Sequence, residues 1–391
     1  AGIDASTGQS AGSVTNAQSA TLSPELSAAA DAMSAVGIDP EKASGISSIN
    51  PVAAPAHQES LRYQGDDALP TPLWPPAPYP DLPPPDPSGE GYAAIVENPF
   101  LDPATQPLST FGVDVDSASY ANVRRFVSQM GTLPPPDAVR IEELVNAFSY
   151  DYPAPPKGSR DPFAVHVEIA DAPWAREHRL VKIGIKGQDM SRRERPAANL
   201  VFLIDVSGSM QDANKLPLVK TALGMLVEEL GAGDRVAIVT YAGQSGLALE
   251  STDSRDRGRI TDAINGLQAG GGTNGSGGIQ LAYQVARSQY RDDGVNRVIL
   301  LTDGDFNVGV TDDGALEDLI SREASSGVFL SVLGFGMGNL QDGRLERLAD
   351  RGNGNYGYID GPEEAQRLLV DQLTGTLVTI AKDVKLQVEF N

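Results

Sequence analysis

Three short segments of the sequence place oxygen-bearing side chains among glycines. The first holds Asp205, Ser207 and Ser209, the second has Thr273 after three glycines, and the third has Asp303 before a glycine. Carboxylate and hydroxyl oxygens are the ligands that hard divalent cations such as Mg²⁺ prefer, in a near-octahedral array. If the three segments meet in space, they predict a cation site. If they do not, the serines and the threonine are better explained as helix caps.

The elements around these segments must bring them together. Four continuous apolar runs are typical of buried parallel strands. The runs are Leu200–Ile204, Val236–Val239, Val298–Leu301 and Val328–Leu333. Helical patterns lie between them, which indicates a doubly wound, mostly parallel α/β sheet with helices on both faces. The first and third segments directly follow predicted strands, and ligands bind such sheets at the carboxyl ends of the strands.

Taken in order, the three segments resemble the metal-ion-dependent adhesion site of von Willebrand factor type A (VWA) domains. Residues 199–380 fit that Rossmann-like fold in size and in the order of their elements. The resemblance assigns direct metal bonds to three hydroxyls, those of Ser207, Ser209 and Thr273. It assigns mostly water-mediated contacts to two carboxylates, Asp205 and Asp303. Mg²⁺ is the expected ion, with Mn²⁺ or Ca²⁺ as alternatives.

Such a site leaves the cation available to a second molecule. Neutral hydroxyl ligands compensate little of its charge, so an open coordination position can accept a carboxylate. The resemblance therefore implies a noncatalytic, adhesion-type module that binds an Asp or Glu of a partner protein. Residues beside the predicted ligands are expected to contact that partner, namely Met210, Asn274 and Asp305.

Composition narrows the function classes. The chain of 391 residues has 30 Lys and Arg against 52 Asp and Glu, a formal charge of −22, no Cys and three His. Clustered basic residues drive nucleic-acid binding, so a nucleic-acid partner is not expected. No run approaches 18 apolar residues, so no transmembrane segment is expected. With no cysteine and no histidine near a candidate nucleophile, an enzyme is not expected either.

The first hundred residues contain many more acidic than basic side chains. They contain 12 acidic and 2 basic side chains, and ten of the eighteen residues from Pro70 to Pro87 are proline. Such a run favours the extended polyproline II conformation and leaves its aromatic residues exposed. We expect residues 1–98 to form an extended, acidic arm, either a disordered linker or a segment that docks on its own body or on a neighbour.

The remaining residues, 99–198 and 381–391, predict a smaller mixed α+β scaffold domain. Residues 163–170, 179–186 and 384–390 alternate apolar and polar side chains, as half-buried antiparallel strands do. A single strand at residues 384–390 needs a sheet to join. We expect it to pair with the strands near 163–186, which makes residues 199–380 an insertion into a β-sandwich-like domain. In a helix after Asp137, the side chains of Ile141 and Val145 are expected to lie on the buried face.

Residues 110–126 and 137–146 resemble the block that precedes the VWA domain in YfbK-like bacterial proteins. That resemblance implies an extracytoplasmic location, in the periplasm, the envelope or the cell surface. An alternative function is that of a structural subunit in a multisubunit surface assembly, in which the arm and a sheet edge form a homo- or hetero-oligomer. The sequence leaves open the partner, the metal used in the cell, a lipid anchor and any continuation beyond Asn391.

Overall fold

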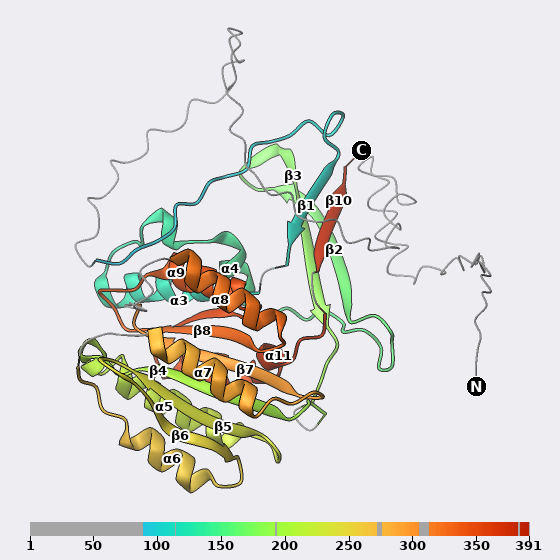
Figure 1. Ribbon diagram of the computed structural model, residues 1–391. Coiled ribbons are helices and arrows are strands. Elements are labelled where there is room, and N and C mark those ends of the chain that lie inside the picture. Colours follow the sequence, from blue (N-terminus) through green and yellow to red (C-terminus); the bar gives the residue numbers. More distant parts are fainter. Residues whose placement is uncertain are drawn as a thin grey trace, which may run out of the picture.

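A six-stranded sheet organises the protein (Figure 1). The computed structural model describes residues 89–390 except for residues 114, 192–193, 272–275, 305–312 and 382–383. The strand order is β6-β5-β4-β7-β8-β9, and only the β5–β6 pair is antiparallel. The strands are β4 (Ala198–Asp205), β5 (Arg235–Tyr241), β6 (Ser245–Asp253), β7 (Val295–Thr302), β8 (Phe329–Phe335) and β9 (Tyr356–Ile359). The predicted doubly wound, mostly parallel α/β sheet is therefore confirmed.

Helices cover both faces of this sheet, and the two faces form separate apolar clusters. Leu200, Phe202 and Ile204 of β4 face one cluster, whereas Val201 and Leu203 face the other. The first cluster contains residues of α5 (Leu216–Glu229), α6 (Arg257–Gly266), α10 (Pro362–Gln366) and α11 (Leu373–Leu377). The second contains residues of α7 (Ser276–Ser288), α8 (Asp313–Ser325) and α9 (Asp342–Arg351). We call residues 198–377 the sheet domain.

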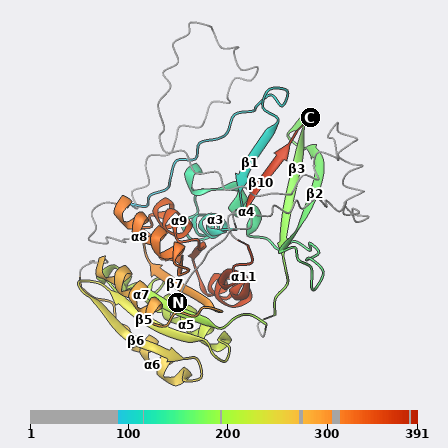
Figure 2. The same cartoon turned by 45° about the vertical axis from the view of Figure 1, so that its right-hand side comes forward.

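Two small antiparallel sheets lie side by side next to the sheet domain (Figures 1 and 2). One is the hairpin of β2 (Phe163–Ala172) and β3 (Ala175–Gly187), and the other pairs β1 (Leu108–Gly112) with β10 (Lys385–Glu389). The prediction that the last strand pairs with the strands near 163–186 is therefore wrong. The two hairpin strands satisfy each other's backbone hydrogen bonds across a tight turn. Strand β1 has no partner close in sequence, and it pairs with β10 instead. The chain thus enters and leaves the sheet domain beside these sheets.

A helical block, residues 115–148 together with the segment 89–95, lies against the sheet domain. It contains α3 (Ala118–Arg125), a π-helical turn (Phe126–Met130), a 3₁₀ turn (Pro136–Ala138) and α4 (Ile141–Asn146). Ala118 and Ala121 of α3 belong to the second apolar cluster of the sheet domain. The block and the sheet domain thus share a core.

Helix α4 faces the opposite way from our prediction. Ile141 is 74% exposed and Val145 is 46% exposed, whereas Glu143 is completely buried. The Glu143 carboxylate accepts bonds from the backbone N and the hydroxyl of Ser119, both at 2.7 Å, and from Nε of Arg140 at 2.6 Å. A buried carboxylate needs such partners, so these bonds orient α4 and override its apolar pattern.

Buried ion pairs join the helical block to the sheet domain. Both terminal nitrogens of Arg140 lie 2.8 Å from Oδ2 of Asp342, the first residue of α9. Asp342 also accepts a bond of 2.7 Å from the Tyr356 hydroxyl. A second pair, within the helical block, joins Arg125 to Glu90 at 2.6 and 2.8 Å, and both side chains are almost completely buried. Glu90 also accepts a bond of 2.9 Å from the backbone N of Gly338 in the sheet domain. The junction therefore contains buried charges that are stabilised by their ion-pair partners rather than by water, so the loss of one partner would destabilise the other.

One carboxyl at this junction makes stability depend on pH. Burial, together with the charges of Glu143, Asp342 and Asp350, raises the pKa of Glu346 to about 7 against the opposing charge of Arg140. The folded state therefore holds a proton that the unfolded state loses near pH 4.5, so this group lowers stability as pH rises from about 4.5 to about 7.

We therefore expect Glu346→Gln to stabilise the protein relative to wild type at pH 8, by on the order of 1–2 kcal/mol, and to have little effect at pH 4. Urea unfolding at both pH values measures this difference. The exposed Glu250→Gln is the control, and it should leave the pH profile unchanged. If the difference in stability between Glu346→Gln and wild type is the same at pH 8 and at pH 4, the raised pKa of Glu346 is contradicted.

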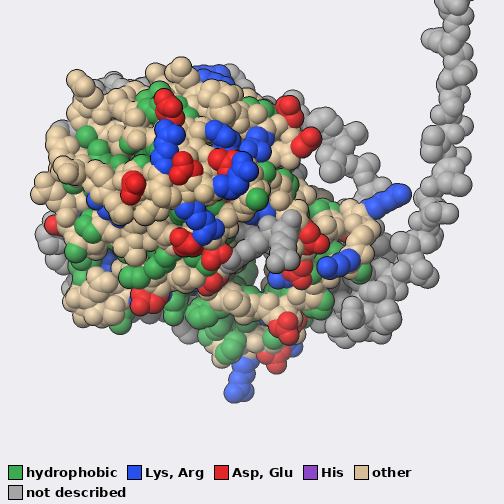
Figure 3. Space-filling model, turned by 90° about the horizontal axis from the view of Figure 1, so that it is seen from below, with side chains coloured by type: hydrophobic (Ala, Val, Ile, Leu, Met, Phe, Trp, Pro, Cys, Tyr) green, Lys and Arg blue, Asp and Glu red, His purple; other side chains and the backbone are tan. Residues whose placement is uncertain are grey.

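The surface near α5 and α6 mixes charges of both signs, as Figure 3 shows from below. Arg257 pairs with Glu228 at 2.5 Å, and Arg255 pairs with Asp253 at 2.8 Å. Basic side chains on this face are thus interspersed with acidic ones rather than gathered into one field. Within the described ranges, no helix combines the length and the apolarity needed to cross a membrane.

Candidate metal centre

Strands β4 and β7 bring two of the three predicted segments to one point. The strands are adjacent and parallel, with Ile204 beside Leu301, so the loops that follow them leave the same edge at the centre of the sheet. Asp205 ends β4, and Asp303 directly follows the last residue of β7. Both carboxylates are completely buried. The parallel register explains why residues nearly one hundred positions apart meet here.

The Asp205 carboxylate organises the loop after β4. One oxygen accepts a bond of 2.8 Å from the backbone N of Ser207, and the other lies 3.4 Å from the Thr302 hydroxyl. Burial is the main cause that raises the pKa of Asp205 to about 6, and the nearby charge of Asp303 adds to it, whereas the bonds from Ser207 oppose it. A second carboxylate so close is costly unless a cation compensates the pair.

The two predicted serine ligands lie together above Asp205. Their Oγ atoms are 3.0 Å apart. The second predicted segment approaches them, because the backbone N of Gly208 donates to the carbonyl of Gly271 at 3.1 Å and the N of Gly270 donates to Val206 at 2.8 Å. Thr273 and Asn274 follow within residues 272–275, and Asp305 falls within residues 305–312, so these three predicted site residues lie outside the described residues.

Asp303 has neighbours that the sequence did not reveal. Its Oδ2 lies 2.9 Å from the ammonium of Lys215, the residue before α5. The same ammonium lies 3.1 Å from Oδ1 of Asn339, in the loop between β8 and α9. Burial alone would raise the pKa of Asp303, but bonds from Asn339, Lys215 and Ser209 hold it below its usual value. Asp303 is therefore ionised and already paired with a cationic side chain.

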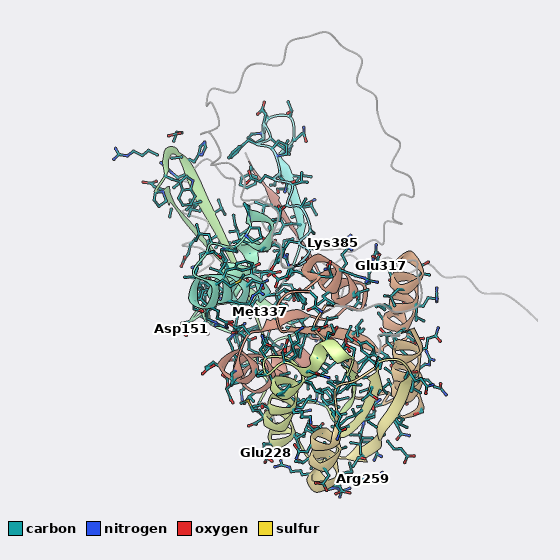
Figure 4. All side chains as sticks on the ribbon, turned by 90° about the vertical axis from the view of Figure 1, so that its left-hand side faces the viewer. Asp151, Glu228, Arg259, Glu317, Met337 and Lys385 are labelled. Atoms are coloured by element: carbon teal, nitrogen blue, oxygen red, sulfur yellow. The ribbon has the colours of Figure 1, made fainter. Side chains whose placement is uncertain are left out.

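A glycine permits the close approach of these loops. Gly304 has a φ of 110°, and a Cβ there would lie 2.4 Å from the carbonyl oxygen of Asn339. Only glycine adopts this conformation and fits this space without displacing the backbone. The loop between β8 and α9, in which Figure 4 labels Met337, also bonds to the start of the helical block through Gly338 and Leu340. The loop between β8 and α9 therefore contacts the centre and the helical block.

Met210 does not reach the surface. Its side chain is completely buried and belongs to the first apolar cluster of the sheet domain. It packs into the core because the short 3₁₀ turn Gly208–Gln211 directs it inward. Our expectation that Met210 contacts a partner is thus at odds with its burial.

Three residues of the centre escaped the sequence analysis: Thr302, Lys215 and Asn339. Thr302 directly precedes Asp303 and could have been found, because a strand-end hydroxyl next to a predicted ligand lies at the same edge. Lys215 and Asn339 are 124 positions apart. Nothing in the pattern of either segment indicates that they meet.

The donors fit a hard divalent cation. Neighbouring ligands of an octahedral ion with bonds of about 2.0–2.1 Å are separated by about 2.9 Å. The hydroxyls of Ser207 and Ser209 are separated by 3.0 Å, so both could bind one ion. In the described part of the chain, no three His, Asp or Glu side chains gather into a metal-binding group. A cation here would therefore depend on hydroxyl oxygens as well as on carboxylates.

Comparison with known families identifies the sheet domain. Residues 199–372 match the family model of the von Willebrand factor type A domain, and residues 86–182 match a model described as von Willebrand factor. The chain belongs to the VWA family. VWA domains commonly serve in adhesion or protein interaction and typically bind a divalent cation. They are generally not enzymes, although proteins similar to this chain include a magnesium-chelatase subunit and an E3 ubiquitin-protein ligase.

Relatives of this VWA protein include bacterial and human chains. It is 47% identical over 311 residues to the uncharacterized protein YfbK of Escherichia coli K12, which covers 78% of this chain and 54% of YfbK. It is 32% identical over 196 residues to the uncharacterized protein sll0103 of Synechocystis, which covers 50% of this chain and 45% of that protein. It is 33% identical over 162 residues to human inter-alpha-trypsin inhibitor heavy chain H4, a match that covers 39% of this chain and 17% of that protein. The VWA chain thus spans about half the length of YfbK and of sll0103.

Solved structures with a similar fold include a von Willebrand factor type A protein from Catenulispora acidiphila. That structure is 19% identical, has a TM-score of 0.42, and covers 56% of this VWA chain and 51% of its own. BatB from Bacteroides thetaiotaomicron is 21% identical with a TM-score of 0.39, over 46% of this chain and 98% of its own.

Proposed function

We propose that this VWA domain is a noncatalytic module that binds a carboxylate of a partner protein through a divalent cation, Mg²⁺ before Mn²⁺ or Ca²⁺. Ser207, Ser209 and Thr273 would hold the ion, with Asp205 and Asp303 behind them. The observation that carries the proposal is the 3.0 Å spacing of the two serine hydroxyls above a buried carboxylate. That spacing suits neighbouring positions around one hard ion.

The charges at the centre favour an anionic partner. Asp205 and Asp303 supply two negative charges, and Lys215 supplies one positive charge next to Asp303. A divalent cation would therefore leave the centre with a net charge of about +1, and the hydroxyl ligands add none. A partner's Asp or Glu neutralises this charge when it enters the coordination shell. The protein's overall charge of −22 repels such a partner, but salt screens this repulsion beyond about 8–10 Å, and the bound cation would dominate at close contact.

We further propose that the protein acts outside the cytoplasm of a bacterial cell, in the periplasm, the envelope or on the surface. The high identity to YfbK supports a bacterial setting. The absence of cysteine is compatible with an oxidising compartment. Detection of the protein in periplasmic or envelope fractions of its native cell checks this part of the proposal.

Capture of the partner tests the central part. Immobilised protein is incubated with an envelope extract in Mg²⁺ and then eluted with EDTA. We expect EDTA to release a partner that wild type retains. We expect Ser209→Ala to retain at least about tenfold less of this partner than wild type does. Ser288→Ala, in the last turn of α7, is the control and should retain as much as wild type. Equal retention in Mg²⁺ and in EDTA would refute the metal-bridged mechanism.

A second function, that of a structural subunit in a surface assembly, is favoured by the small sheets. Each has only two strands among the described residues, so outer strand edges remain for a neighbour's strand. Phe100 is 92% exposed and Trp174, at the turn of the β2–β3 hairpin, is 78% exposed. Association that persists in EDTA but is lost without residues 1–88 would support this function over the first.

A further inference from the structure

Lys215 is a buried cation at the edge of the candidate metal centre. Its side chain is 6% exposed, and its ammonium contacts Asp303 at 2.9 Å and Asn339 at 3.1 Å. A lysine is strongly hydrated in water, so burying its charge is expensive unless it is paired. The pairing is with a carboxylate that is also predicted to serve the divalent cation. Two positive charges would therefore share one acidic group.

The surrounding backbone encloses this lysine. Gly336 has a φ of 78°, and a Cβ there would lie 2.5 Å from Cε of Lys215. The loop that contains Gly336 and Asn339 is in turn held by the start of the helical block. The backbone N of Gly338 donates to Glu90 at 2.9 Å, and the N of Gly91 donates to the carbonyl of Leu340 at 2.8 Å. Lys215 thus cannot turn to solvent unless this loop moves.

We propose that Lys215 is a built-in counter-ion of the centre, with two effects. It holds Asp303 in place when no divalent cation is bound, and it weakens the binding of that cation by repulsion. This inference rests on the proposed metal site, but it concerns a residue that binds no metal. Lys215 is a positioning residue because it acts through Asp303.

The expected size of the repulsion follows from distance and burial. A metal ion that uses Asp303, even through one water, lies within several ångströms of the Lys215 ammonium. Charges at such distances inside a protein interact strongly, since the effective dielectric constant is far below that of water. Removal of the lysine charge should therefore tighten the binding of a divalent cation by about tenfold or more.

The same change should make the fold depend on metal. Without Lys215, Asp303 remains buried with no cation beside it, which is strongly destabilising. A bound divalent cation would replace the missing charge. We therefore expect Lys215→Met to have a lower Tm than wild type in EDTA. We also expect Mg²⁺ to raise the Tm of this variant more than it raises that of wild type.

The experiment compares wild type, Lys215→Met and the control Lys220→Met. Lys220 lies in α5, the helix that follows Lys215, and its ammonium makes an exposed bond to the carbonyl of Asn265. Titration with Mn²⁺ alone, followed by electron paramagnetic resonance, gives Kd, and melting in EDTA and in Mg²⁺ gives Tm. Lys215→Gln, which keeps an amide donor but no charge, serves if the Met variant does not fold. We expect both Lys215 variants to bind Mn²⁺ about tenfold more tightly or better, and Lys220→Met to match wild type.

Two results would overturn the counter-ion role: an affinity for Mn²⁺ that is unchanged or weaker in the Lys215 variants, or a Tm in EDTA equal to that of wild type. A different result bears on the proposed function. If wild type binds no Mn²⁺ while Lys215→Met does, the lysine alone occupies the centre in the native protein, and the metal-bridged function fails.

Discussion

Replacement of Arg140 by Met is expected to lower the free energy of unfolding by about 3–5 kcal/mol. The guanidinium contacts Glu143 at 2.6 Å and Asp342 at 2.8 Å, and both carboxylates are completely buried. Without Arg140 these two charges lose their main compensation, and the burial of an uncompensated charge is one of the most destabilising single changes in a protein. Urea unfolding at pH 7, monitored by circular dichroism, measures the loss.

Arg179→Met is the matched control. Arg179 also pairs with a carboxylate, Asp171 at 2.9 Å, but its side chain is 49% exposed and that of Asp171 is 79% exposed. Exposed pairs contribute little, so this change should cost less than about 1 kcal/mol. Similar losses for the two variants would show that the junction between the helical block and the sheet domain does not depend on the buried charges.

Asp205→Asn is expected to weaken binding of Mg²⁺ by about 100-fold or more. The substitution keeps the shape of the side chain but removes a negative charge at a buried position, where a charge acts with little screening. It also replaces an oxygen that accepts the backbone N–H of Ser207 at 2.8 Å. A wrongly turned amide would therefore disturb the serine loop as well. Isothermal titration with Mg²⁺ at pH 7.5 measures the change.

Asp212→Asn provides the comparison within the same loop region. Asp212 is exposed and directly follows the 3₁₀ turn Gly208–Gln211. Its charge is screened by solvent, so its loss should change the Mg²⁺ affinity by less than about threefold. If Asp205→Asn binds Mg²⁺ as well as Asp212→Asn does, the centre described here is not where the cation binds.

The buried part of the sheet could be predicted because its sequence pattern has few alternatives. Four runs of continuous apolar residues match the strands β4, β5, β7 and β8, which lie inside the sheet. The outer strands β6 and β9 were missed. Six of the nine residues of β6 are polar or glycine and many are exposed, and β9 has only four residues. Edge strands have neighbours on one side only and therefore need no apolar run.

Helix α4 shows where apolar periodicity fails. Its pattern placed Ile141 and Val145 inside, but the residue that is buried is Glu143. The cause is a tertiary charge network with Arg140 and Ser119, which no local pattern reveals. The last strand was likewise predicted correctly as a strand but assigned to the wrong partner. Its pairing with β1 joins residues more than 270 positions apart.

The candidate metal centre could likewise be predicted from the sequence only in part. Asp205, Ser207 and Asp303 could be proposed as ligands because each lies within a few residues of a recognisable strand end. Lys215 and Asn339 were not found, because their contact with Asp303 exists only after β7, β8 and α5 have packed together. Such contacts modify a site rather than define it. Sequence patterns thus found candidate ligands, and the structure found what surrounds them.

The most direct test of the metal centre is the anomalous scattering of Mn²⁺ in crystals of the wild-type protein. We predict one strong peak per chain within direct bonding distance of the Oγ atoms of Ser207 and Ser209, and no such peak in crystals of Asp205→Asn grown in the same Mn²⁺ concentration. A wild-type map without a peak at the two serines, or with the Mn²⁺ bound elsewhere, would contradict the proposed metal centre.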